Sequence, residues 1–396
     1  ALASSCSFGG GVVQGYGNQS GRFGGTFFGE GSGDMYVQRF AVDLSNSMPF
    51  NAVVGRIGSQ TANPYVFKRK DNSPYFDNSR WDDGNWTVDG ALVSFKVGQG
   101  SLSILGGRNN DRLTNNGVEL QPVLNDSSTL VQDTLGAEAK FNLGANANLS
   151  AAYFMHFLTG NGTSATGGAD RLEVFGAGLN YNLGGGLTAG VNYASSALKN
   201  QGSTVADDNN TALAVELGYG TDKWGLVGGY HRIDRDFMSA GSWYRIGTNY
   251  SPMNVEDWMV KGWFKLGTNG KITASYMDGE NVRSAESASP TAAINNFEYT
   301  SFKADLDYTV WGNWNLLLGY ESVDLDGSRT PFLSTTTNYS IEQKWTSLGL
   351  SYNMSSNSMF KVLYQYGDVK NGRAWGAGPS GNYKGHILTS QISIKF

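Results

Sequence analysis

The chain has 396 residues, a net charge of −5 and a pI near 5.3, which argues against a nucleic-acid-binding protein. Gly is frequent at 54 residues, Pro is rare at 8 and aromatic residues reach 13%, a composition that excludes disordered and collagen-like chains. Mean hydropathy is −0.33 and no long apolar run occurs, which excludes a transmembrane helix. A membrane-spanning β-barrel is not excluded, because each of its strands is apolar on one face only.

In chain order, the first sixty residues alternate between polar and apolar less cleanly than the rest. We expect residues 1–10 to be an N-terminal extension and the first strand to begin near Val12–Phe28. No composition shift or linker follows, so residues 11–396 are predicted to form a single domain.

The clearest hairpin lies between residues 172 and 193. Apolar side chains such as Phe175 and Leu179 alternate there with Gly or Asn, three glycines follow at 184–186, and the alternation resumes at Leu187. A period of two predicts β-strands with one apolar and one polar face. The same pattern recurs at 213–219, 302–308, 314–320, 348–352, 360–366 and in the final strand, 388–396.

Short Gly/Asn turns alternate with long polar connections along the chain. The long connections are predicted at 61–83, 109–129, 159–171, 198–208, 233–253, 279–295, 324–339 and 368–380. This rhythm favours an all-β, transmembrane, antiparallel up-and-down barrel of about 16–18 strands, with 18 preferred. Burying the polar faces against another sheet would cost roughly 1–3 kcal/mol for each unpaired group, whereas a water-filled lumen solvates them. Lipid outside forbids an open edge, so we expect the last strand to pair with the first.

Aromatic side chains such as Tyr181, Tyr193 and Tyr219 stand near the strand ends on the apolar face, as in the aromatic girdles of membrane barrels. With these girdles, the strand rhythm and a final alternating strand that ends on Phe396, the sequence resembles a Gram-negative outer-membrane porin. It is more loosely similar to porins with S-layer-homology domains, although no such domain precedes residue 10. The resemblance implies an outer-membrane location, short periplasmic turns, long extracellular loops and a homotrimer. It also implies contact with outer-membrane lipid and lipopolysaccharide, and recognition of Phe396 by the barrel-assembly machinery.

No motif indicates covalent chemistry, a cofactor or a metal. The three histidines fall in separate strands with no ligand spacing, which together with a single Cys6 argues against a structural zinc site, and one cysteine excludes an internal disulfide. Residues 267–273 lack the first Gly of a phosphate-binding loop and read as a tight turn. A Ser/His cluster assembled across the barrel wall, as in outer-membrane phospholipases, stays an alternative.

The predicted function is a porin, not an enzyme, for passive diffusion of ions and small hydrophilic solutes. A selective sugar or oligosaccharide channel is the alternative, although Phe154 and Trp263 are too few for an aromatic ladder along the lumen. Charges on the polar face should set ion preference, and three lysines of one hairpin form the densest basic stripe, Lys261, Lys265 and Lys271. The predicted pore-lining residues are these three with Arg39, Asp43, Arg56, Glu138, Lys140, Lys303, Asp305, Asp307, Glu321, Lys361 and Lys395.

The loop at 61–83 is the first candidate for an inward-folded constriction, because it mixes basic, acidic and aromatic residues. Its candidate residues are Lys68, Arg69, Lys70, Arg80, Asp82 and Asp83. The loop at 233–253, with Asp234, Arg235 and Asp236, is the second candidate.

Overall fold

The computed structural model describes residues 3–11, 13–17, 34–44, 50–68, 86–109, 118–119, 130–159, 169–200, 203–206, 210–241, 243–246, 249–250, 254–282, 294–329, 337–372 and 381–394. None of these residues is helical, so this part of the chain offers no helix able to cross a bilayer.

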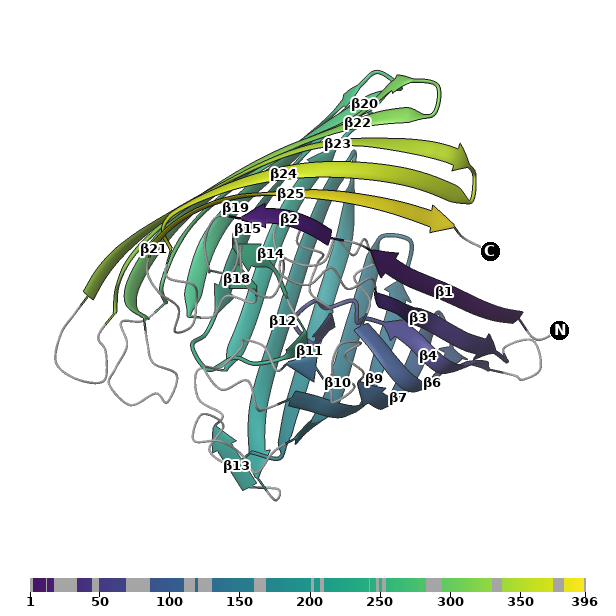
Figure 1. Cartoon of the computed structure of the whole chain (residues 1–396). Helices are drawn as coiled ribbons and strands as arrows, with labels where there is room; N and C mark the ends of the chain where they lie inside the picture. The colour runs from purple at the N-terminus through teal and green to yellow at the C-terminus, as the bar shows by residue number, and fades with distance from the viewer. Residues whose placement is uncertain are drawn as a thin grey trace.

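The strands follow one another in chain order around one sheet (Figure 1). Its strands are β1 (Ala3–Gly11), β2 (Val13–Gly17), β3 (Asp34–Asp43), β4 (Asn51–Ser59), β6 (Trp86–Val97), β7 (Gly100–Asn109), β9 (Leu130–Leu143), β10 (Ala147–Thr159), β11 (Arg171–Gly184), β12 (Leu187–Asn200), β14 (Thr211–Gly220), β15 (Trp224–Ile233), β19 (Val255–Leu266), β20 (Gly270–Glu280), β21 (Ile294–Trp311), β22 (Trp314–Arg329), β23 (Thr337–Ser355), β24 (Ser358–Gly372) and β25 (Gly381–Ile394). Shorter strands are β5 (Phe67–Lys68), β8 (Val118–Glu119), β13 (Ser203–Ala206), β16 (Ala240–Gly241), β17 (Arg245–Ile246) and β18 (Asn249–Tyr250).

From β3 to β25 the sheet has 17 antiparallel up-and-down strands, which confirms the predicted fold class and lies within the predicted range. The N-terminal segment joins the two ends of this series, since β1 pairs with β3 and β2 pairs with β25. The predicted pairing of the last strand with the first is therefore present from Val13↔Thr389 to Gly17↔Gly385. Beyond Val13 the two strands diverge and the sheet is not closed (Figure 1). The sequence predicts an extension over 1–10, whereas residues 3–11 are a strand of the sheet.

Tight turns gather at one end of the sheet and long connections at the other. Gly98, Gly144, Gly267 and Gly312 stand in these turns with φ between +55° and +75°, a conformation that glycine adopts without steric cost. The pair Ser358↔Ile394 places the end of β25 beside the turn at 356–357. The start of β1 and the end of β25 lie on the same side of the molecule (Figure 1).

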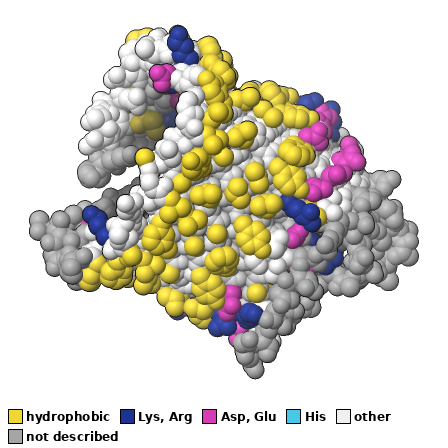
Figure 2. All heavy atoms as spheres, turned by 180° about the vertical axis from the view of Figure 1, so that it is seen from behind, with side chains coloured by type: hydrophobic (Ala, Val, Ile, Leu, Met, Phe, Trp, Pro, Cys, Tyr) yellow, Lys and Arg dark blue, Asp and Glu magenta, His cyan; other side chains and the backbone are white. Residues whose placement is uncertain are grey.

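The outward face carries a broad apolar band, visible across the back of the molecule in Figure 2. Leu217, Trp258 and Trp311 belong to it, with Trp311 73% exposed, as do Leu388 and Ile392 of the last strand. Solvent-exposed apolar side chains on this scale are unusual for a protein in water and typical of a surface that contacts another apolar phase. Opposite-charge pairs on the same face, such as Arg108–Asp133, stand near the ends with long connections.

Adjacent residues of β23 point to opposite faces of the sheet, so substitutions at the two positions should have different effects. Leu348 points outward and is 49% exposed, whereas Ser347 points inward and accepts a hydrogen bond from Gln365. In phospholipid bilayers Leu348→Arg should destabilise the barrel by roughly 2–4 kcal/mol, the cost of arginine at mid-bilayer depth. Urea unfolding in vesicles measures this loss, and Ser347→Arg is the control. Equal losses for both variants would contradict the assignment of faces.

Candidate functional site

Cross-strand register decides which charged side chains point into the barrel. Eleven of the predicted pore-lining residues occupy inward positions: Asp43, Glu138, Lys140, Lys261, Lys265, Lys271, Lys303, Asp305, Asp307, Glu321 and Lys361. The structure does not describe the side chains of Arg39, Lys68, Arg69, Lys70, Arg80, Asp82, Asp83, Lys395 and Phe396, so these predictions lie outside the described residues.

Arg56 does not fit the pore-lining prediction. Its neighbour Ile57 is buried inside the barrel, whereas Val54, on the same face as Arg56, is 45% exposed. Arg56 therefore points outward, where its guanidinium donates to both oxygens of Asp89 at 2.7 and 2.8 Å. The ion pair belongs to a row of alternating charges that continues through Arg108 to Asp133.

The first long connection enters the barrel as soon as it leaves β4. Residues 61–67 lie against the inner face of the wall, where the Ala62 N–H donates to Glu138 Oε1 at 2.6 Å. The Asn63 amide donates to two backbone oxygens, one on β11 and one on β12, at 3.0 and 2.8 Å. The Phe67 ring stacks on the inward ring of Phe154 with 5.1 Å between centroids. We call residues 61–67 the first inward segment.

Glycine makes this contact possible on β11. A Cβ added to Gly176 would stand 2.3 Å from the Val66 Cγ2 atom and 2.9 Å from the Asn63 Nδ2 atom. The wall thus has a recess in which the first inward segment rests.

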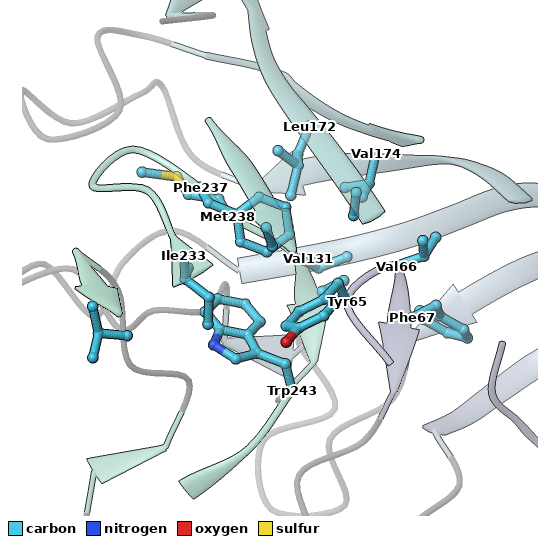
Figure 3. Packing of buried hydrophobic residues seen from close by; sticks show 14 of the residues in the cluster. Tyr65, Val66, Phe67, Val131, Leu172, Val174, Ile233, Phe237, Met238 and Trp243 are labelled. Carbon is cyan, nitrogen blue, oxygen red and sulfur yellow. The ribbon is translucent and has the colours of Figure 1, made fainter. Parts of the chain in front are cut away.

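The second candidate loop also folds inward, over residues 234–241 and 243–246, which we call the second inward segment. Its Phe237 ring meets Tyr65 of the first segment edge-on, 6.2 Å between centroids, and contacts Trp243 at 5.1 Å. A short parallel pairing of β5 with β16 and a 2.8 Å bond from Ser239 Oγ to the Val66 oxygen join the two segments. Figure 3 shows both packed against wall residues such as Leu172 and Val174. Folding inward was predicted for one of the two loops, and the described parts of both do so.

A hydrophobic core therefore occupies part of the space that the sequence predicts to be a polar, water-filled lumen. Leu172, Val174, Ala212 and Ala214 point inward and are buried beneath the two segments. The inward lysines Lys140, Lys261, Lys265 and Lys271 lie in the half of the wall near the short turns. The signal was present in the sequence, because Leu172, Val174, Ala212 and Ala214 place apolar residues near the long connections on the face otherwise taken by polar residues and glycine.

One carboxylate on the wall collects three hydrogen bonds. The Asp257 side chain is fully buried, and its Oδ1 accepts from His231 Nδ1 at 2.9 Å. Its Oδ2 accepts from the hydroxyls of Tyr244 and Tyr299 at 2.6 and 2.7 Å. Burial, then Tyr299 and Asp257, raise the pKa of Tyr244 well above its ordinary value, so this hydroxyl remains a donor. Sequence reasoning missed this cluster, whose members come from distant segments.

His231 of this cluster is one of the histidines that a Ser/His catalytic cluster across the barrel wall could use. His231 Nδ1 faces Asp257, and its Nε2 lies 3.9 Å from Glu216 Oε1. Both imidazole nitrogens thus face carboxylates, and neither is directed at a serine or cysteine nucleophile. In the described part of the chain, no group of three or more His, Cys, Asp or Glu residues is arranged to hold a metal.

The lysine stripe lies on the inner wall near the short turns. Lys265 and Lys271 stand directly opposite each other on β19 and β20. Their ammonium groups lie 5.9 and 5.4 Å from the centroid of the inward Trp263 ring. Like charges directly opposite in a sheet are destabilising, so the pair raises the positive potential of this wall at a cost to stability. Lys303 differs, because it pairs with Asp305 at 3.2 Å.

No family model and no curated protein matches the sequence. Solved structures of outer-membrane porins from Pseudomonas aeruginosa do resemble it. OccK3 (OpdO) has a TM-score of 0.54 at 12% identity, with 98% of this chain and 95% of that chain covered. OccK5 (OpdH) has a TM-score of 0.53 at 11% identity, with 100% and 98% covered.

The chain has the fold of an outer-membrane porin. At these identities the likeness concerns the fold, and it extends over the full length of both proteins. The structural neighbours are porins and not enzymes.

Proposed function

We propose that the protein is a channel in the outer membrane of a Gram-negative bacterium and passes small hydrophilic solutes and ions by diffusion. The observation that carries the proposal is the division of one meandering sheet into two faces. The outer face is a broad apolar band, and the inner face carries charges near the short turns. An apolar exterior suits lipid and a charged interior suits water, so the arrangement supports a transmembrane aqueous path.

Planar-bilayer recording of the reconstituted protein tests this proposal. Stepwise conductance increases are expected, because each inserted barrel adds one water-filled path. A protein that inserts, as shown by heat-modifiable electrophoretic mobility, and yet gives no steps would contradict it.

The inward segments favour a selective channel over a wide general one. They cover the inner wall from β9 to β15 on the side of the long connections, so a solute meets a narrowed entrance before it reaches the charged half. Trp263 flanked by Lys265 and Lys271 then offers an aromatic face with positive charge on the open wall. We infer a preference for small anionic solutes.

Neutralising the lysine stripe tests that preference. Changing Lys261, Lys265 and Lys271 together to Gln should lower the anion-to-cation permeability ratio roughly twofold or more, because lumen charges set the local ion concentration. The reversal potential in a salt gradient measures the ratio. A matched control removes three outward lysines, Lys344, Lys370 and Lys384, which pair with acidic residues on the outer face. Equal shifts in both triple variants would show that the stripe does not line the conducting path.

The proposal extends to the oligomeric state of the protein, its lipid environment and its assembly. We propose a homotrimer embedded in lipid and lipopolysaccharide, assembled by the barrel-assembly machinery through Phe396. The apolar outward positions of Leu388 and Ile392 support insertion of the last strand into lipid. Deleting Phe396 should lower the yield of folded protein in the outer membrane, measured as the heat-modifiable fraction.

A further inference from the structure

Asp234 ties the base of the second inward segment to the wall: its N–H donates to the Thr211 oxygen at 2.8 Å, and its carboxylate accepts from Thr211 Oγ1 at 2.6 Å and from Arg232 Nε at 3.4 Å. Beyond this base, Met238 and Tyr244 make further hydrogen bonds to the wall. The Met238 N–H donates to Ser196 Oγ at 3.0 Å, and the Tyr244 hydroxyl donates to Asp257 Oδ2 at 2.6 Å. The ring contacts of Phe237 are made with Tyr65 and Trp243, which belong to the inward segments themselves. Asp234 pairs with the charged wall residue Arg232 at the base of the segment, and beyond that base the bond from Tyr244 ends on the charged wall group Asp257.

The Asp257 carboxylate has hydrogen-bond donors besides Tyr244. Two wall residues, His231 and Tyr299, donate to it at 2.9 and 2.7 Å. If Tyr244 left, the buried carboxylate would keep two donors, and the Tyr244 hydroxyl would find water in the lumen. Breaking the bond from Tyr244 to Asp257 therefore leaves no buried charge without a hydrogen-bond partner.

The cluster also reaches the open part of the lumen. Glu216 is half-exposed on the inner wall, and its Oε1 lies 3.9 Å from His231 Nε2. A chain of charged and polar groups thus runs from a solvent-accessible carboxylate through His231 and Asp257 to the inward segment.

We propose that Tyr244 and Asp257 form a latch that holds the second inward segment in the channel, and that the channel has a second state in which this latch is open. The inference rests on the proposed channel function. In the latched state the segment narrows the entrance, and in the open state it has left the wall and the conductance is higher. Asp257 is a positioning residue in this scheme, since it acts on the solute path through Tyr244.

The two tyrosines provide a matched pair of variants, because both donate to the same oxygen at nearly the same distance. Tyr244→Phe removes one hydrogen bond between the segment and the wall, whereas Tyr299→Phe removes a bond within the wall. A hydrogen bond to a charged group is strong enough for its loss to change an equilibrium about tenfold or more. Single-channel recording should therefore show about ten times more time at a higher conductance level in Tyr244→Phe. Tyr299→Phe should gate like the unmodified protein while losing comparable stability.

Cysteine labelling is a second measurement, which reports the position of the second inward segment independently of conductance. Met238 is 5% exposed, so a cysteine there in a Cys6→Ser background reports departure of the segment from the wall. Its labelling rate by a polyethylene-glycol maleimide should rise about tenfold with Tyr244→Phe and stay unchanged with Tyr299→Phe.

Equal gating and equal labelling in the two tyrosine variants, with conductance intact, would overturn the latch. Absence of conductance from every protein, including the unmodified one, would reject the channel function instead. The two failures are thus distinguishable.

Discussion

Asp257→Ala is expected to cause the largest loss of stability among single substitutions on the inner wall. The change leaves His231, Tyr244 and Tyr299 without their shared acceptor in a buried site. Removing one partner from a buried charged pair costs roughly 3–5 kcal/mol. Urea unfolding in phospholipid vesicles measures the loss, with refolding followed to establish reversibility.

Asp278→Ala is the control for this prediction. Asp278 lies on the neighbouring strand β20, points outward and is exposed, with only a 3.4 Å contact from the Tyr276 hydroxyl. Its loss should change the free energy of unfolding by about 0.5 kcal/mol or less. If Asp257→Ala were equally mild, the three hydrogen bonds would not hold this part of the wall together.

Gly176→Ala is expected to have the largest effect on the first inward segment. The added methyl group would overlap Val66, 2.3 Å away, and press on the Asn63 amide that anchors the segment to β11 and β12. Forcing an extra carbon into a packed site costs roughly 1–3 kcal/mol. Because the wall strand cannot move without breaking its ladder, we expect the segment to shift into the lumen. Single-channel conductance should change as a result.

Gly228→Ala serves as the matched control, since a Cβ there meets nothing within 4 Å. Both substitutions replace a strand glycine by alanine, so any difference between them reports the contact with Val66. Unchanged conductance and stability in Gly176→Ala would show that Val66 does not rest in the recess.

The architecture followed from local alternation along the chain. A period of two sorts residues such as Phe175 and Gly176 onto opposite faces, and short glycine turns force neighbouring strands to run antiparallel. These are properties of residues a few positions apart, which is why the fold class and the pairing of the last strand with the first were predictable. The assignment of Arg56 was wrong because the first sixty residues alternate weakly, and one residue of error in register moves a side chain to the other face.

The sequence by itself thus determined a single meander with an apolar outside, a polar and charged inside and a final alternating strand that ends on Phe396. Only the tertiary structure decided that two connections enter the barrel and bury part of its inner face. The bond from Asn63 to the Tyr193 backbone spans 130 positions, and the Asp257 cluster joins three wall strands to a loop. Such contacts depend on how the curved sheet brings distant segments together, and no local pattern encodes that geometry. Asp257 was one acidic residue among 34 in the sequence, and its three donors exist only in the folded barrel.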